Sequence, residues 1–203
     1  MKFNMKKAAA LLLAGSMVAG YAVPAAAEAE EKVVTAAMDQ AWDTMMPLNT
    51  TSNYTRFICD QIYDRLTQTN ADGSIEGRLA ESWTVNDASD AVTFKLHEDA
   101  VWSDGEPVTA EDVVFSYQMY SDPSVEAKSR YHLEYIAGVD DSGAELSEDS
   151  IEVTADSDYE VTFKLKEAMY PDTFLQDIDT VFIIPKHIFL SLIHISEPTR
   201  RVV

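Results

Sequence analysis

The stretch VTFKLHEDAVWSDGEPVTAEDVVFSYQMYSDP, residues 92–123, contains the clearest secondary-structure signals in the chain. Its first five residues alternate apolar and polar side chains, which is the period-two pattern of a half-buried strand. Thr109 followed by Asp112 has the spacing of a capping box at the start of a helix. The sequence SDPS at 121–124 ends that helix. The stretch therefore predicts a strand, a turn at Asp104–Gly105 and a helix with one inward apolar face.

Short elements are predicted on either side of this stretch. Residues 32–39 read as a buried strand, because the apolar run is too short for a typical helix. Residues 53–68 place apolar side chains at helical spacing, and Cys59 within them is expected to be buried. Residues 70–74, NADGS, predict a turn. The pentapeptide VTFKL recurs at 161–165 as a second strand without a wider repeat. Alternating strands and helices indicate a mixed α/β (α+β) class.

The first 27 residues have the order of a secretory signal peptide. Lysines precede an apolar run rich in alanine and glycine, and small residues then allow cleavage before Glu28. The run is shorter than the ~20 residues that a membrane-spanning helix needs. Ser16 stands where a lipoprotein signal would carry the lipid-bearing cysteine. We therefore expect a periplasmic or extracellular protein that is cleaved before Glu28 and has no lipid anchor.

The chain is strongly acidic, with 35 acidic and 15 basic side chains and a formal net charge of −20. A field of this sign repels nucleic acids and anionic membrane surfaces and favours solubility. The charge therefore argues against nucleic acid as a partner.

Catalytic and metal-binding motifs are absent from the sequence. It lacks the G-x-S-x-G, H-E-x-x-H, P-loop and G-x-G-x-x-G patterns. The histidines have no cysteine or acidic residue at zinc-ligand spacing; they are His97, His132, His187 and His194. Four carboxylates could supply the pair of a glycosidase-like hydrolase, but their spacing fits a turn and a helix cap better; they are Asp104, Glu106, Glu111 and Asp112. We expect no catalytic residue, metal or cofactor, and keep a secreted carboxylate hydrolase as a distant alternative.

Three blocks, residues 61–85, 92–123 and 159–189, together resemble the family 5 extracellular solute-binding proteins, the peptide-binding components of ABC importers. The most specific part is W-S-D-G-x-P-V-T-A-x-D-V at 102–113. The resemblance implies a type II periplasmic-binding-protein fold, of which this chain would hold the first lobe and an inserted small domain but not the second lobe. It also implies a peptide ligand enclosed between closing lobes, ABC permease subunits as membrane partners, and a monomer at full length. No bond would be made or broken.

The resemblance also suggests domain boundaries. Residues 28–52 would begin the ligand-binding lobe, residues 53–177 would form the small subdomain, and residues 178–189 would be a return strand to the lobe. The likeness ends at Phe189. From Leu190 the residues match the translation of a sequencing-library adapter, so we expect residues 190–203 not to be native.

Ligand contacts are implied for the loop that follows the first predicted strand. By the resemblance, the ligand-binding residues are Gln40, Ala41, Trp42 and Asp43. Trp42 could equally pack in the lobe core, because its ring suits either burial or stacking. A binder of nickel chelate, haem or oligosaccharide is the alternative within the family. Residues 28–189 alone are expected to bind no peptide measurably.

Overall fold

The computed structural model describes residues 35, 37–41 and 44–196, and the chain divides into two units, residues 1–37 and 38–203. All the elements below belong to the second unit. The helices are α2 (Asn53–Cys59), α3 (Ala110–Ser121), the 3₁₀-helix η1 (Arg130–Leu133), α4 (Pro171–Ile178) and α5 (Lys186–Ser196). The strands are β1 (Thr67–Thr69), β2 (Ile75–Gly77), β3 (Ala80–Val85), β4 (Ala91–Leu96), β5 (Val153–Ser157) and β6 (Glu160–Lys164). No helix in this described part is long and apolar enough to cross a membrane.

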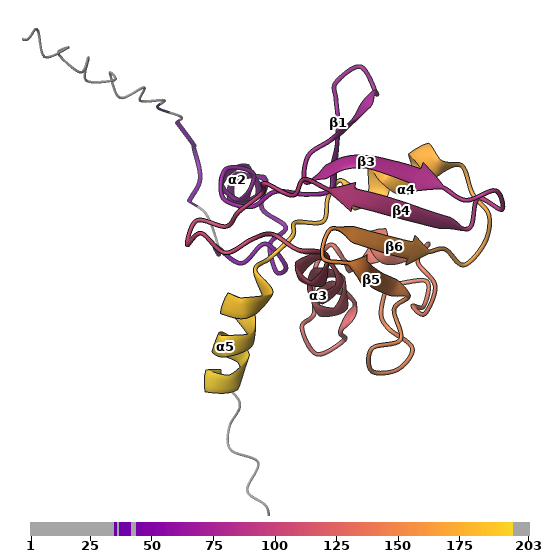
Figure 1. The fold of residues 1–203 in the computed structure, drawn as a ribbon. Helices are drawn as coiled ribbons and strands as arrows, with labels where there is room; N and C mark the ends of the chain where they lie inside the picture. Colours follow the sequence, from indigo (N-terminus) through magenta and orange to yellow (C-terminus); the bar gives the residue numbers. More distant parts are fainter. Residues whose placement is uncertain (1–34, 36, 42–43, 197–203) are drawn as a thin grey trace, which may run out of the picture. The chain divides into compact units, whose positions relative to one another are not determined.

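An antiparallel sheet in the order β3-β4-β6-β5 forms the centre of the unit (Figure 1). The two VTFKL segments lie in its central strands, β4 and β6, and pair directly with each other. Phe94 is opposite Val161, and the hydroxyls of Thr93 and Thr162 are 2.8 Å apart. The prediction of two strands with similar packing requirements is confirmed, because both central strands bury the same face.

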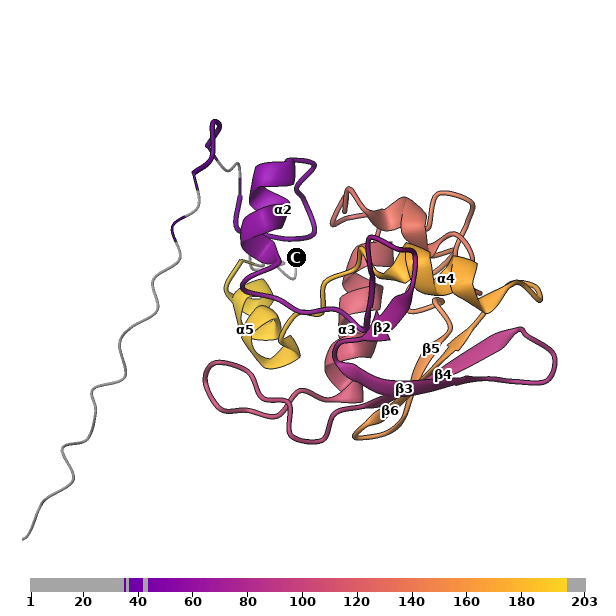
Figure 2. The same cartoon turned by 90° about the horizontal axis from the view of Figure 1, so that it is seen from above.

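One face of the sheet carries the core. Figure 2 shows α3 and α4 on the same side of the sheet. The ring of Phe163, which is fully buried, contacts Phe94 at 5.4 Å between centroids, Tyr117 of α3 at 4.7 Å and Phe174 of α4 at 5.7 Å. Phe163 thus packs both helices against the central strands. Edge-to-face and tilted ring contacts of this kind add to the free energy gained by burial.

The predicted start and end of α3 are confirmed. The Thr109 backbone N–H donates to the Asp112 carboxylate at 2.9 Å, and the two residues form the capping box. The turn before the helix contains Gly105 at φ +93°, a conformation that glycine adopts at little cost. The helix ends at Ser121, and Asp122 caps it. The predicted turn at 70–74 also forms, between β1 and β2.

The helix predicted over residues 53–68 is wrong in its second half. Helix α2 ends at Cys59, which is buried as expected, and Thr67 already belongs to β1. Phe57 and Ile62, which the helical spacing placed on a buried face, are 50% and 51% exposed. Pairing of β1 with β2 gives the backbone N–H and C=O groups of this segment hydrogen-bond partners, and Leu66 becomes completely buried. Further helical turns would not provide both.

The strands predicted at residues 32–39 and 178–189 are also wrong. Of residues 32–39, the described ones have no strand structure: Thr35, Ala37, Met38 and Asp39 are exposed, and residues 32–34 and 36 lie outside the described residues. Residues 178–189 include no strand either. Residues 181–184 are buried but join neither sheet, and α5 begins at Lys186 after Pro185. Their N–H groups find other acceptors: Ile183 donates to the Asp64 carbonyl and Ile184 to the Ser116 hydroxyl, each at 2.9 Å.

Candidate functional site

The chain enters and leaves the sheet through two segments that are bonded to each other, residues 63–69 and 178–183. The Ile183 N–H donates to the Asp64 carbonyl at 2.9 Å, and the Thr69 N–H donates to the Asp179 carboxylate at 3.1 Å. The rings of Tyr63 and Phe182 lie 6.3 Å apart. We call this pair of segments the junction. Because its partners are more than 100 residues apart in sequence, each bond closes a long loop.

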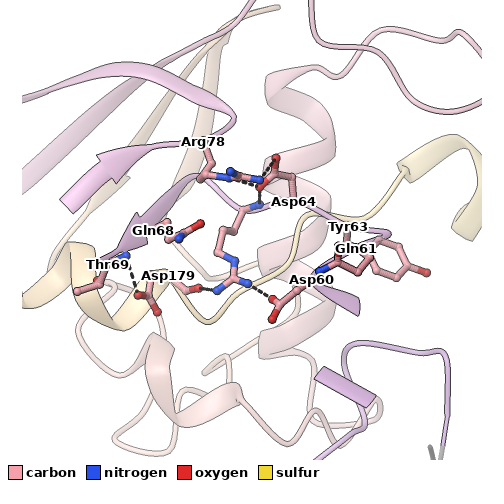
Figure 3. A pocket seen from close by; sticks show the side chains of 9 residues that line it. Asp60, Gln61, Tyr63, Asp64, Gln68, Thr69, Arg78 and Asp179 are labelled. Carbon is pink, nitrogen blue, oxygen red and sulfur yellow. Dashed lines mark hydrogen bonds and ion pairs between the residues drawn. The ribbon is translucent and has the colours of Figure 1, made fainter. Parts of the chain in front are cut away.

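A polar cavity of about 440 Å³ opens at the junction (Figure 3). Arg65 lines the cavity, donates to the Asp179 carbonyl at 2.8 Å and forms an ion pair with Asp60. Arg78 contacts both oxygens of the Asp64 carboxylate, at 3.0 and 3.3 Å. The complete lining is Asp60, Gln61, Tyr63, Asp64, Arg65, Gln68, Thr69, Arg78 and Asp179.

The charges in this cavity already satisfy one another. The guanidinium of Arg65 also packs over the Phe182 ring at 4.9 Å, and burial, followed by the neighbouring Arg56, lowers the pKa of Arg65. Because the pKa of an arginine side chain is normally far above neutral, Arg65 stays charged at neutral pH. Both guanidiniums have carboxylate partners, and no lining side chain is paired as a nucleophile with a general base. The arrangement is therefore suited to holding the two segments together and not to catalysis.

Replacing Arg65 should lower the free energy of unfolding. Arg65→Met removes the donors to Asp179 and Asp60 and should lower the free energy of unfolding by about 2 kcal/mol, since hydrogen bonds to charged groups contribute about that much. Urea denaturation of the purified chain measures this change. Arg78→Met is the matched control: its side chain is 42% exposed, so its ion pair should contribute below about 1 kcal/mol. Equal losses in the two variants would contradict the role given to Arg65.

The carboxylates of the 102–113 motif have partners in α5, at the other end of the chain. Asp104 lies 2.8 Å from His187, and Glu111 lies 2.6 Å from Lys186. The contact between Asp104 and His187 lowers the pKa of the carboxyl and raises the pKa of the imidazole. Asp112 accepts from the Lys186 backbone N–H at 2.8 Å. The turn and cap roles predicted for these acids are thus accompanied by contacts to α5 that the local pattern did not indicate.

Two of the four predicted ligand residues can be placed. Gln40 and Ala41 are exposed and lie outside regular secondary structure, whereas Trp42 and Asp43 lie outside the described residues. Neither Gln40 nor Ala41 lines the junction cavity. Their role as ligand contacts stays a prediction. Among the described residues, no group of three or more histidine, cysteine or acidic side chains could hold a metal ion.

Comparison with known proteins places the chain within a family. Residues 74–199 match the model of the bacterial extracellular solute-binding proteins, family 5 middle region. This match runs past Phe189, so the prediction that the likeness ends there is wrong; that residues 190–203 are not native stays a prediction. The Escherichia coli K12 periplasmic oligopeptide-binding protein OppA is 41% identical over 86 residues, which are 41% of this chain and 16% of that protein. The nickel-binding periplasmic protein of the same organism is 31% identical over 122 residues, 60% of this chain and 20% of that protein.

A solved structure gives the same fold. Listeria monocytogenes OppA bound to peptide superposes with a TM-score of 0.64 at 25% identity, over 71% of this chain and 29% of that one. The chain thus spans about a sixth of the length of the E. coli oligopeptide-binding relative and less than a third of the solved Listeria chain. The expected fold class, a mixed α/β part of a type II periplasmic-binding-protein fold, is confirmed.

Proposed function

We propose that this chain, which belongs to the family 5 bacterial extracellular solute-binding proteins, is part of an extracytoplasmic protein that captures peptides and delivers them to an ABC permease. The observation that carries the proposal is the family match over residues 74–199. Likeness to oligopeptide-binding proteins from several bacteria supports peptide as the ligand. The protein is a binder and not an enzyme in this proposal, and it works outside the cytoplasm after removal of residues 1–27.

The described residues contribute a support for the ligand site. The chain enters and leaves the sheet at the junction. There Arg65 bonds to Asp60 and to the Asp179 carbonyl and so holds residues 60–65 against residue 179. A support of this kind has to hold its geometry while ligand binds, and partly buried charge-assisted hydrogen bonds serve that purpose well. We place ligand contacts in the loop of residues 40–43, ahead of this support.

Gln40 offers a test of that loop. Its side chain is exposed, so Gln40→Ala should leave the fold unchanged. In the product of the complete parent gene, the substitution should weaken peptide binding about fivefold, the loss expected from one hydrogen bond of about 1 kcal/mol. Fluorescence titration with a peptide that the wild type binds measures the change. Gln61→Ala, another exposed glutamine, is the control; an unaltered affinity in Gln40→Ala would remove this residue from the site.

The competing ligand classes can be separated by their effect on stability. A ligand that binds only the folded state raises the melting temperature, by an amount that grows with the logarithm of its concentration relative to its Kd. We expect a mixture of short peptides to raise the melting temperature of the complete gene product, and a nickel chelate, haem or an oligosaccharide not to do so. Stabilisation by the nickel chelate alone would favour the alternative suggested by the nickel-binding relative. A secreted hydrolase would show itself by an activity that Asp104→Asn or Glu111→Gln abolishes.

A further inference from the structure

A second cavity, of about 230 Å³, differs from the junction cavity in its charge. It lies between residues 47–53 and 128–131, with Phe182 in its wall. Two hydrogen bonds hold the two segments together: the Lys128 backbone N–H donates to the Leu48 carbonyl at 2.8 Å, and the Asn49 side chain donates to the Val125 carbonyl at 3.0 Å. The cavity is therefore built by parts of the chain that are about 75 residues apart. We call it the Arg56–Lys128 pocket.

The lining of this pocket contains two cationic side chains and no acidic one. In a chain with 35 acidic and 15 basic residues, a lining without any carboxylate is unexpected. The junction cavity shows the usual arrangement, because both its arginines are paired with aspartates. The contrast indicates that the positive charge of the Arg56–Lys128 pocket is available to something other than the described residues.

Arg56 is the better placed of the two cations. Its side chain is half-buried and its guanidinium lies over the Phe182 ring at 5.5 Å. Nη2 donates to the Thr180 carbonyl at 3.3 Å, and no carboxylate of the described residues lies within ion-pair distance. A partly buried charge without a counter-ion is costly, so this arrangement favours an incoming anion. A guanidinium held by ring stacking and one carbonyl keeps most of its donors available for a planar or tetrahedral oxyanion.

The remaining lining adds donors suited to the same chemistry. The Lys128 side chain is exposed and forms no ion pair with any residue that the structure describes, so it can approach a ligand from the open side. Ser129 and Tyr131 bring hydroxyl groups to the pocket. Two cations with neutral hydroxyl donors and no acid make up a set that binds carboxylate or phosphate groups.

We propose that the Arg56–Lys128 pocket binds an oxyanion, either a carboxylate or a phosphate group, through the Arg56 guanidinium and the Lys128 ammonium. The site does not depend on peptide capture by the whole protein, since it is complete within residues 47–182. Its volume of about 230 Å³ is below that of pockets that enclose a drug-sized ligand, which makes it a subsite for the charged end of a molecule or for a free anion.

Calorimetric titration of the purified chain tests the proposal. Sodium phosphate and sodium glutarate are titrated separately at constant ionic strength, with sodium chloride as the blank. We expect saturable millimolar binding of at least one of the two, a rise of at least tenfold in its Kd in Arg56→Gln, and no change in Arg78→Gln, whose guanidinium is already paired. Binding of phosphate only would assign a phosphate-bearing ligand, and binding of glutarate only a carboxylate-bearing one.

Two outcomes would overturn the proposal. One is heat no greater than the chloride blank for both anions. The other is an equal change of Kd in Arg56→Gln and Arg78→Gln, which would mean that only the general field of the protein is being measured. If Arg56→Gln does not fold, Lys128→Gln replaces it, because that side chain is exposed; it should raise the Kd several-fold, and an unaltered Kd there overturns the proposal as well.

Discussion

Replacing Phe163 with alanine should lower the free energy of unfolding by about 4 kcal/mol, the loss that is typical for removing a large aromatic side chain from a packed core. The ring is fully buried and contacts Phe94, Tyr117 and Phe174, so its removal leaves a cavity between the sheet and two helices. Urea denaturation of the purified chain, followed by circular dichroism, gives the difference.

Phe57→Ala is the matched control for this substitution. It removes the same number of atoms, but the Phe57 ring is 50% exposed on α2. Its loss should cost below about 1 kcal/mol. If the two variants lost similar stability, the sheet face that carries Phe94 and Phe163 would not be the core of the protein.

Asp112→Asn should cost about 3 kcal/mol, although the side chain keeps its shape. The Asp112 carboxylate is only 5% exposed and accepts from the backbone N–H groups of Thr109 and Lys186, at 2.9 and 2.8 Å. The Trp102 indole N–H approaches it at 3.4 Å. An asparagine side chain offers one acceptor oxygen where two are used, so a buried backbone N–H would lose its partner and face an amide N–H₂ group.

Hydrogen exchange distinguishes this effect from general loss of stability. Because Asp112 connects the start of α3 to the start of α5, amides near Lys186 should lose protection in Asp112→Asn more than those of β4 and β6. The control is Glu111→Gln, which removes only the exposed ion pair to Lys186 and should cost below about 1 kcal/mol. Unchanged protection near Lys186 would show that Asp112 acts only as the cap of α3.

The features that the sequence predicted correctly are those that depend on near neighbours. The alternation in VTFKL reports one buried face, and this is why both central strands were located. The Thr109–Asp112 capping box involves residues three apart, and the turn at residues 70–74 is set by its own five residues. Local spacing is sufficient for such features because their hydrogen bonds close within the segment.

The features that were missed depend on distant parts of the chain. Helix α2 stops early because Arg65 bonds to Asp179 and Leu66 enters the core, neither of which the spacing of apolar residues in 53–68 reports. The second role of Asp112, toward Lys186, crosses 74 positions. Arg65 and Arg78 take their carboxylate partners from the same segment, Asp60 and Asp64, but the bond from Arg65 to the Asp179 carbonyl crosses 114 positions, and no local pattern reports it.

Isothermal titration calorimetry of the complete gene product with a set of short peptides tests most directly whether the whole protein, of which these residues are part, captures peptides. The predicted result is saturable one-to-one binding of at least some peptides, each recovered intact by mass spectrometry after the titration. Absence of binding for every peptide together with saturable binding of a nickel chelate, haem or an oligosaccharide, or recovery of cleaved peptides, would contradict the claim.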